Sequence, residues 1–232
     1  MGSLAGVEMT TGYKPRLEGT HQVPAAAVAA SIDDGKKHLL LAASGSVAAT
    51  KLPLIISAFR GHQNLSIRLI LTEKAVRFLA GQSPEQPTVS SLASLSNVDG
   101  IYLDEDEWSH PWKRDSNILH IELRRWAHLL AIVPMSANLL ADIAGGFCHD
   151  LLTCVIRAWD TSRTIIVAPA MNQLMWEQPV AVKQISVLTE EWKWFDVLSP
   201  QITEACDDLG EEAMRDWTGI VTVIEKRLMI LE

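Results

Sequence analysis

The loop Ser44-Gly45-Ser46-Val47 contains residue types that could bind an anion. It follows a short apolar run and opens a segment whose apolar residues have helical spacing, so its backbone N–H groups would lie at a helix start. Such N–H groups, together with the helix dipole, attract anions. Gly45 allows a tight turn, and the Ser46 hydroxyl can donate to a phosphate oxygen or cap the helix. The loop therefore predicts either a phosphate site or a plain turn with a serine cap.

The pattern of this loop narrows the kind of phosphate it could bind. It lacks the G-x-G-x-x-G pattern of dinucleotide sites and the Gly-Lys-Thr of triphosphate loops. A single phosphate group, such as that of FMN, fits the loop better. Small and hydroxyl residues also follow three later apolar runs, at 72–74, 134–138 and 169–172.

Apolar runs alternate with helical patterns along the chain. Runs typical of buried parallel strands cover 38–43, 129–134 and 164–169. An alternating pattern at 65–71 predicts another strand, and Ile101-Tyr102 close a further one. Helical spacing covers 47–59, 73–80, 139–159 and 179–190, and we expect Thr218 to cap a last helix. This alternation predicts a single α/β domain, a doubly wound parallel sheet with helices on both faces. Ligands bind such sheets beyond the carboxyl ends of the strands, where the loops above would lie.

Composition excludes some classes of protein. The 232 residues carry a formal net charge of -8, which argues against nucleic-acid binding. No apolar run is long enough to span a membrane. Three cysteines, Cys148, Cys154 and Cys206, suggest reduced thiols in the cytoplasm, with the nucleus as a second location. We expect Cys148 and Cys154 to be buried core thiols. Residues 1–36 lack periodicity and are interpreted as a disordered or loosely ordered tail before a domain at 37–232.

From Leu40 onward the chain resembles the phosphopantothenoylcysteine decarboxylases, within the homo-oligomeric flavin-containing cysteine decarboxylases. The resembling segments occur in family order and cover nearly all of residues 38–230. They include Leu-Ala-Ala-Ser-Gly-Ser-Val-Ala-Ala at 41–49, Asp-Glu-Asp-Glu-Trp at 104–108, Leu-His-Ile-Glu-Leu-Arg-Arg-Trp-Ala at 119–127 and Pro-Ala-Met-Asn-Gln-Leu-Met-Trp at 169–176. The resemblance implies a flavodoxin-like fold, bound FMN near a subunit interface, and a homotrimer.

The resemblance also implies a reaction, in which 4'-phosphopantothenoylcysteine loses carbon dioxide to give 4'-phosphopantetheine. An amide-linked cysteine carboxylate has no electron sink of its own. Oxidised flavin would create one by converting the thiol carbon to a thioaldehyde, and reduced flavin would return the electrons to the enethiol that remains. The cofactor supplies the redox chemistry, while the protein supplies position and protons.

Site residues follow from the same resemblance. His120 matches the active-site base, and Cys206 matches the proton donor in the last reduction. Asn172, Met175 and Arg125 are expected to contact the substrate, with Asn172 binding its carboxylate. The expected FMN contacts are Gly45, Ser46, Val47, Thr72, Ser136, Ala137, Asn138 and Ala170. We expect no metal.

The segment around Cys206, which the family uses as a mobile flap, departs from the family pattern. Asp207 and Glu212 replace two glycines, and the added negative charge would repel an anionic substrate. Elsewhere, Leu139 stands where many members have threonine. The alternative function is that of the halotolerance-type relatives, which bind FMN and inhibit a protein phosphatase.

Overall fold

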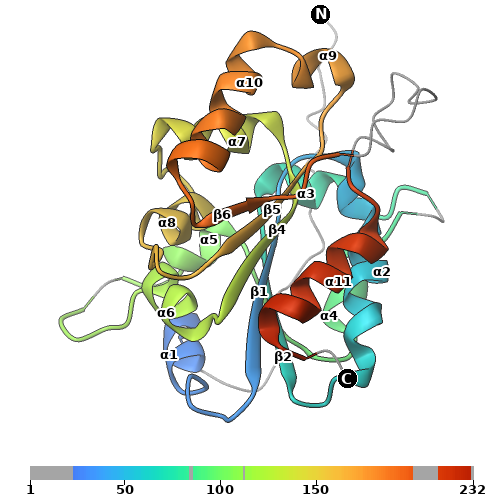
Figure 1. Ribbon diagram of the computed structural model, residues 1–232. Coiled ribbons are helices and arrows are strands. Elements are labelled where there is room, and N and C mark those ends of the chain that lie inside the picture. Colours follow the sequence, from blue (N-terminus) through green and yellow to red (C-terminus); the bar gives the residue numbers. More distant parts are fainter. Residues whose placement is uncertain (1–22, 84–85, 112, 201–213, 231–232) are drawn as a thin grey trace, which may run out of the picture.

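A six-stranded, all-parallel sheet lies between two layers of helices (Figure 1). The computed structural model describes residues 23–83, 86–111, 113–200 and 214–230. The strands are β1 (Lys37–Ala43), β2 (Leu65–Leu71), β3 (Val98–Tyr102), β4 (Leu129–Met135), β5 (Ile165–Pro169) and β6 (Phe195–Val197). The predicted doubly wound α/β sheet is thereby confirmed.

The strands lie in the order β3-β2-β1-β4-β5-β6, so the chain reverses its direction of winding between β1 and β4. Dinucleotide-binding sheets have the same order. In both cases a crevice opens at this reversal, beyond the carboxyl ends of the two central strands. The fold therefore places the loop after β1 where a nucleotide-like ligand would bind.

Helices cover both faces of the sheet (Figure 1). Buried side chains of α2 (Leu52–Ala58), α3 (Glu73–Phe78), α4 (Val89–Ala93) and α11 (Trp217–Leu228) pack on one face. Those of α1 (Pro24–Ala29), α6 (Leu119–Trp126), α7 (Ala137–Gly145) and α8 (Leu151–Arg157) pack on the other. The remaining helices are α5 (Asp104–Glu107), α9 (Gln173–Trp176), α10 (Pro179–Ser186), the 3-10 turns η1 (Val47–Lys51) and η2 (Phe59–Gly61), and the π-helical turn η3 (Val187–Glu191).

The central strands β1 and β4 are mostly apolar because both of their faces are covered. Leu39 and Leu41 of β1 point into the core on the α2 and α11 side, whereas Leu40 and Ala42 point into the core beneath α6. This alternation is the two-residue period of a strand. Among the described residues, no helix is both long and apolar enough to cross a bilayer.

The amino-terminal boundary of the domain lies earlier than the sequence indicated. Residues 24–29 form helix α1, whose Ala25 and Val28 are buried against the core beside α6. The expected tail of 1–36 is therefore wrong for its last part, because a short alanine-rich segment gave no periodic signal. Residues 1–22 lie outside the described residues.

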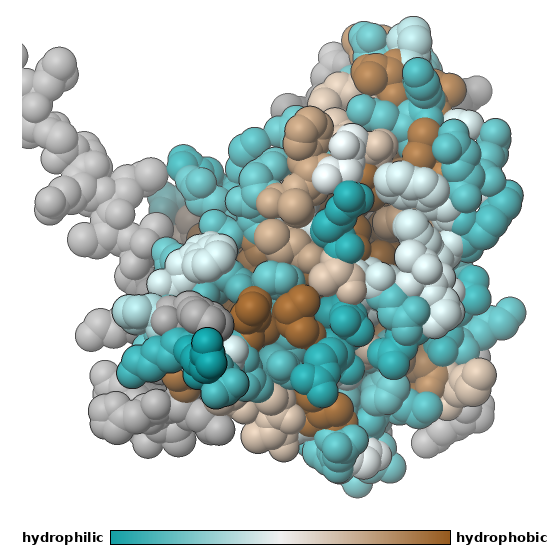
Figure 2. All heavy atoms as spheres, turned by 90° about the vertical axis from the view of Figure 1, so that its left-hand side faces the viewer, coloured by the Kyte–Doolittle hydropathy of each residue, from teal (hydrophilic) through white to brown (hydrophobic). Residues whose placement is uncertain are grey.

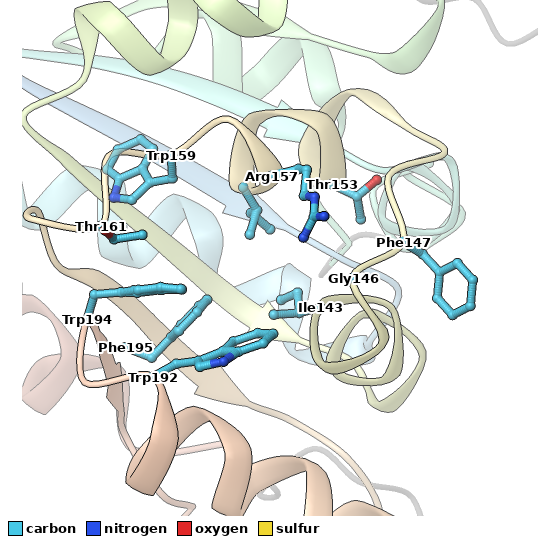
Figure 3. A pocket seen from close by; sticks show the side chains of 11 residues that line it. Ile143, Gly146, Phe147, Thr153, Arg157, Trp159, Thr161, Trp192, Trp194 and Phe195 are labelled. Carbon is cyan, nitrogen blue, oxygen red and sulfur yellow. The ribbon is translucent and has the colours of Figure 1, made fainter.

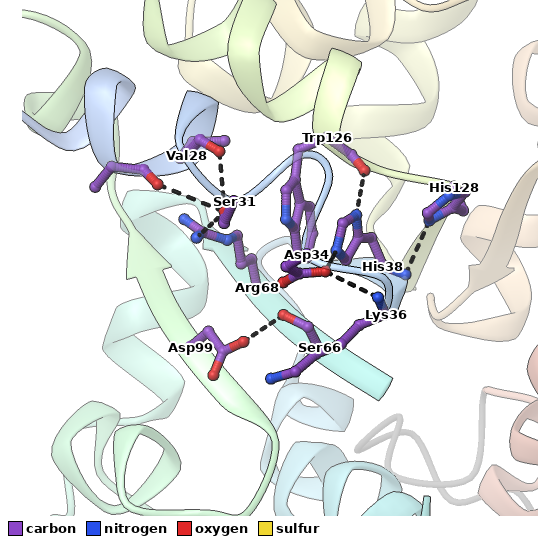
Figure 4. Close-up of polar contacts among 11 residues, drawn as sticks. Val28, Ser31, Asp34, Lys36, His38, Ser66, Arg68, Asp99, Trp126 and His128 are labelled. Carbon is purple, nitrogen blue, oxygen red and sulfur yellow. Dashed lines mark hydrogen bonds and ion pairs between the residues drawn. The ribbon is translucent and has the colours of Figure 1, made fainter. Parts of the chain in front are cut away.

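A polar network ties the segment after α1 to the sheet and to α6 (Figure 4). The fully buried His38 places Nδ1 2.9 Å from the carbonyl oxygen of Trp126 and Nε2 2.8 Å from a carboxylate oxygen of Asp34. Arg68 donates to the hydroxyl of Ser31 over 2.9 Å, and its guanidinium lies 4.9 Å above the Trp126 ring. These contacts hold residues 31–38 on the domain.

The last helix, α11, begins with a different cap from the one expected. Asp216, not Thr218, is the N-cap residue, and its carboxylate accepts from the backbone N–H groups of Thr218 at 3.0 Å and Gly219 at 3.3 Å. The Thr218 hydroxyl donates to the same carboxylate. A carboxylate is also the better cap, because it carries the charge that a helix start favours.

Candidate functional site

A cleft with a volume of about 270 Å³ opens at the carboxyl ends of the central strands. Loops after β1, β2 and β4 form most of its wall, together with the beginnings of α5 and α8. Its lining includes Ser44, Gly45, Thr72, Lys74, Ser136 and Asn138. All six belong to loops that the sequence singled out, at the carboxyl ends of the strands.

Ser44 joins the two loops at the reversal point. Its hydroxyl donates to the carbonyl of Pro134 over 3.1 Å and accepts from the backbone N–H of Ser136 over 2.7 Å. The Ser46 hydroxyl accepts from the N–H of Ala48, which starts the 3-10 turn η1. The loop after β1 is thus held rigidly beside the start of α7.

Gly45 packs too closely against the neighbouring loop to carry a side chain. A Cβ atom at this position would come within 2.6 Å of the Cβ of Lys74. A contact that short would push the loops after β1 and β2 apart. The glycine therefore allows the backbone of this turn to line the cleft directly.

Two further helices begin at the cleft with capping hydroxyls. Thr72 accepts from the N–H of Ala75 at the start of α3, and Ser136 accepts from the N–H of Leu139 at the start of α7. Their amino termini add partial positive charge to this end of the sheet. Of the other expected cofactor contacts, Asn138 lines the cleft, whereas Ser46, Val47, Ala137 and Ala170 do not.

Carboxylates in the cleft wall are already engaged. Glu73 accepts from Arg77 over 2.7 Å, and Asp104 accepts from the backbone N–H of Leu151 over 2.7 Å. Asp150 accepts from the backbone N–H of Thr153 over 2.8 Å, and Asp142 lies 3.5 Å from a ring nitrogen of His149. The hydrogen bond from Arg77 lowers the pKa of Glu73. Lys74 and His149 are the cationic residue types in the wall; Lys74 belongs to the predicted loop 72–74, but neither was among the expected site residues.

His120 lies on the first turn of α6 and does not line the cleft of its own chain. Its Nδ1 lies 3.1 Å from Oε1 of Glu107, and its backbone N–H donates to Oε2 over 3.0 Å. The Glu107 side chain is 4% exposed and the His120 side chain 23%. A buried carboxylate therefore holds an imidazole that remains accessible to another molecule.

The expected substrate contacts also lie outside the lining of the cleft. Asn172 caps α9, its side-chain oxygen accepting from the N–H of Leu174 over 2.8 Å, which leaves the amide N–H groups to donate. Arg125 pairs with the buried Glu122 on α6. Met175 is partly exposed on α9. Cys206 falls outside the described residues.

Apolar side chains are exposed on α9 and α10, next to Asn172. They are Leu174, Met175, Val180 and Val182, and Leu174 is 69% exposed. Figure 2 views the molecule from the left-hand side of Figure 1, and apolar patches interrupt the mostly hydrophilic surface there. Grouped apolar side chains of this kind often mark a contact with another molecule.

A second cavity, of about 200 Å³, lies between α8 and the segment that leads into β6 (Figure 3). Aromatic rings of Trp159, Trp192, Trp194 and Phe195 line it, and Arg157 points into it from α8. It shares no lining residue with the cleft at the strand ends and contains none of the residues expected in the site.

The two described cysteines differ in their environments. Cys148 is exposed, which corrects the expectation of a buried core thiol, because α7 ends at Gly145 and Cys148 lies in the connection to α8. Cys154 is partly buried in α8, and burial raises its pKa to about 11, with smaller contributions from Cys148, Glu107 and Asp150.

Glu107 was missed by the sequence analysis, although it belongs to the Asp-Glu-Asp-Glu-Trp segment. A sequence signal for the role of Glu107 lies at Ile118, the N-cap residue of α6, because its side chain cannot accept a hydrogen bond. A helix start without its own cap needs an acceptor from elsewhere. An acidic segment shortly before the helix is a candidate for that acceptor.

A doubly wound sheet with a tight glycine turn and capped helix starts at its reversal point defines a mononucleotide-binding α/β protein. The model of the Flavoprotein family matches residues 28–229, and the chain belongs to this family.

Comparison with individual proteins places the chain near the cysteine decarboxylases. Phosphopantothenoylcysteine decarboxylase of Arabidopsis thaliana is 43% identical over 82% of this chain and 84% of its own. A solved structure of a PPC decarboxylase mutant complexed with pantothenoylaminoethenethiol is 40% identical, with a TM-score of 0.70 over 82% of this chain and 97% of that chain. The solved structure of the FMN binding protein AtHal3 is 38% identical, with a TM-score of 0.71 over 85% of this chain and 99% of that chain.

Two fungal relatives are much longer than the matched region. The chain spans 30% of a probable thymidylate synthase of Schizosaccharomyces pombe, at 37% identity over 86% of this chain. It spans 34% of coenzyme A biosynthesis protein 3 of Saccharomyces cerevisiae, at 38% identity over 84% of this chain.

Proposed function

We propose that the protein is an FMN-dependent decarboxylase that converts 4'-phosphopantothenoylcysteine to 4'-phosphopantetheine in coenzyme A synthesis. The observation that carries this proposal is the cleft at the reversal point of the sheet, with the Gly45 turn in its wall. This cleft occurs in a chain that covers 84% of the length of the Arabidopsis thaliana phosphopantothenoylcysteine decarboxylase. The crevice suits the cofactor, and the similarity suggests the substrate.

The residues of the cleft fit FMN. Backbone of the Gly45 turn and hydroxyls of Thr72 and Ser136 would hold the phosphate end, near the amino termini of α3 and α7. Asn138 would contact the remainder of the molecule, with Ser46, Val47, Ala137 and Ala170 supporting these loops. When bound, the flavin supplies the two-electron oxidation of the cysteinyl thiol carbon and the later return of those electrons.

The chain's own residues bind the substrate and transfer protons. His120 would take the thiol proton at Nε2, since its Nδ1 is engaged by Glu107. Asn172 would donate its amide N–H groups to the substrate carboxylate, beside Met175. Arg125 would contribute positive charge for an anionic substrate, and Cys206 would donate the proton in the final reduction.

The placement of these groups supports association of several copies of the chain, and we propose a homotrimer on the basis of the family resemblance. The cleft contains cofactor contacts, whereas His120, Arg125, Asn172 and Met175 lie outside its lining in the same chain. At about 270 Å³ the cleft is also slightly smaller than the roughly 300–1,000 Å³ usual for a ligand pocket. A neighbouring subunit that covers the α9–α10 surface would bring the two sets together. We place this assembly in the cytoplasm, with the nucleus as a second location.

Incubation of the FMN-loaded protein with phosphopantothenoylcysteine tests the activity. We expect release of carbon dioxide together with phosphopantetheine, in equal amounts. Boiled protein and pantothenoylcysteine without the phosphate are the controls. Absence of both products from a protein that binds FMN would refute the decarboxylase.

The halotolerance-type function is the second candidate. One relative, phosphopantothenoylcysteine decarboxylase HAL3b of Glycine max, carries a HAL3 name and is 36% identical over 90% of this chain and 92% of its own. The acidic segment around Cys206 favours this candidate, because it would hinder binding of an anionic substrate. Inhibition of a protein phosphatase by the purified protein, without decarboxylation, would support it.

A further inference from the structure

We infer that Glu107 is the positioning residue for His120, and that it fixes the hydrogen of the imidazole on Nδ1 so that Nε2 is free to act as a base. The catalytic part of this inference rests on the proposed function. The structural part concerns the chain alone: one carboxylate accepts from two atoms of the same histidine, the backbone N–H and the ring Nδ1.

The same carboxylate stabilises the start of α6. Ile118, the N-cap residue, has no side-chain acceptor, so the first N–H groups of α6 lack the usual cap. Oε2 of Glu107 accepts the N–H of His120 over 3.0 Å and substitutes for that cap. Since Glu107 ends α5, the contact also fixes α5 relative to α6.

Geometry decides which ring nitrogen carries the hydrogen. An ionised carboxylate only accepts hydrogen bonds, so Nδ1, at 3.1 Å from Oε1, must carry a hydrogen. Among the described residues, no hydrogen-bond partner reaches Nε2. The neutral ring therefore presents an unshared electron pair at Nε2, and the neighbouring carboxylate stabilises the cation that forms when Nε2 takes a proton.

The surroundings of Glu107 strengthen this assignment. Its side chain is 4% exposed, and within the described residues His120 is the only cationic partner within 4 Å. Cys154 of α8 is another ionisable group near it, since Glu107 contributes to the raised pKa of that thiol, and Asp104 and Asp106 belong to the same short helix α5. None of these is basic, so the imidazole is the natural partner for this carboxylate.

Glu107→Gln is the decisive variant, because the amide keeps the size of the side chain and can donate to Nδ1. We expect the ring hydrogen to move to Nε2 and decarboxylation to fall by about 100-fold or more, the range for loss of general-base catalysis. FMN absorbance and the melting temperature should change little. Glu107→Asp, which keeps the charge, should retain the Nδ1 hydrogen and recover part of the rate.

Nitrogen NMR of ¹⁵N-histidine-labelled holoprotein reports the position of the ring hydrogen, and His120→Asn assigns the signal. Glu225→Gln is the matched control, because it removes a carboxylate that lies 3.0 Å from His62 on the opposite face of the sheet. That variant should leave both the His120 signal and the rate unchanged.

Two results would overturn the inference. One is a Glu107→Gln protein whose His120 hydrogen stays on Nδ1, whatever its rate. The other is a Glu107→Gln protein whose ring hydrogen has moved to Nε2 but which decarboxylates as fast as an active wild-type protein. The NMR result does not depend on turnover, so a failed proposed function would be recognised separately, by an inactive wild type that still has its hydrogen on Nδ1.

Discussion

Histidines that look alike in the sequence have different environments in the folded chain. Four of the described histidines lie within 4 Å of a carboxylate: His38, His62, His120 and His149. His38 is fully buried, and His149 is mostly exposed beside a partly exposed partner. His120 combines an accessible ring with a carboxylate that is almost completely buried. That combination suits a base that must meet a substrate in one fixed orientation.

Replacement of His120 by asparagine should abolish carbon dioxide release without loss of FMN. The asparagine cannot accept a thiol proton, so we expect the rate to fall by about 100-fold or more. The flavin absorbance of the purified variant should match that of the wild type, because His120 does not line the cleft. Decarboxylation at the normal rate would show that another group is the base.

Cys148 and Cys154 should react with iodoacetamide at different pH values. Cys148 is exposed and should be labelled readily, whereas the pKa of Cys154 is raised to about 11. The thiolate is the reactive form, so labelling of Cys154 should rise only as the pH approaches 11. Mass spectrometry of peptides from the labelled native protein measures both. Equal labelling at pH 8 would contradict the burial of Cys154.

At the scale of single elements, the turn after β1 depends on having no side chain at Gly45. Gly45→Ala should force the loops after β1 and β2 apart, because the new methyl group would lie 2.6 Å from the Cβ of Lys74. We expect FMN affinity to fall by about tenfold or more, the effect of roughly 1.4 kcal/mol.

Fluorescence titration of the apoprotein with FMN measures this loss. Gly61→Ala is the matched control, since a Cβ there meets no atom within 4 Å. Equal FMN affinity in the two variants would show that the Gly45 turn is not part of the phosphate site.

The cap of α11 predicts a pH-dependent contribution to stability. Asp216→Ala should cost about 1 kcal/mol at neutral pH and lower the melting temperature by about 2–4 °C. The hydrogen bond from the Thr218 side chain lowers the pKa of Asp216, so this contribution is present above about pH 4 and is lost as the pH falls through the lowered pKa. Thermal melts of both proteins at pH 7 and pH 3 should therefore differ less at the lower pH.

The elements that the sequence predicted best are those with a strong hydrophobic signal. The strands β1, β2, β4 and β5 are buried on both faces; β4, β5 and most of β1 appear as continuous apolar runs, whereas Ser66 and Arg68 interrupt the apolar residues of β2. The edge strand β6 was missed because it has three residues and follows a segment of tryptophans and charges. Helix α1 was missed because six residues are too few to show a period.

Only part of the candidate site could be predicted from the sequence, as was the case for the helices and strands. The loops at the strand ends were recognised from their glycine and hydroxyl residues, which depend on local sequence. The Glu107–His120 pair was not, since it joins side chains that are 13 residues apart and belong to different helices. Likewise, no local pattern could show that His149 faces the cleft and pairs with Asp142.

At the scale of the whole molecule, the exposed surface of α9 and α10 predicts self-association. Light scattering should give three times the 25.6 kDa mass of the chain. Val180 is 60% exposed, so Val180→Glu should place a charge in the subunit contact without disturbing the core. We expect this variant to have a smaller mass and weaker FMN binding. A monomeric wild-type protein that binds FMN would contradict the trimer.

The network between α1 and the sheet sets the limits of the smallest piece of this chain that can fold independently. A chain shortened to begin at Lys37 would lose Asp34, the partner of the buried His38, and Ser31, which accepts from Arg68. Each of these two buried polar side chains would then lose a partner, and the hydrogen bonds of His38 with the Trp126 carbonyl and of Arg68 with the Tyr102 hydroxyl would remain. Because α1 also buries Ala25 and Val28, we expect a fragment for crystallisation or limited proteolysis to fold stably only if it begins at or before Pro24, although the sheet itself starts 13 residues later.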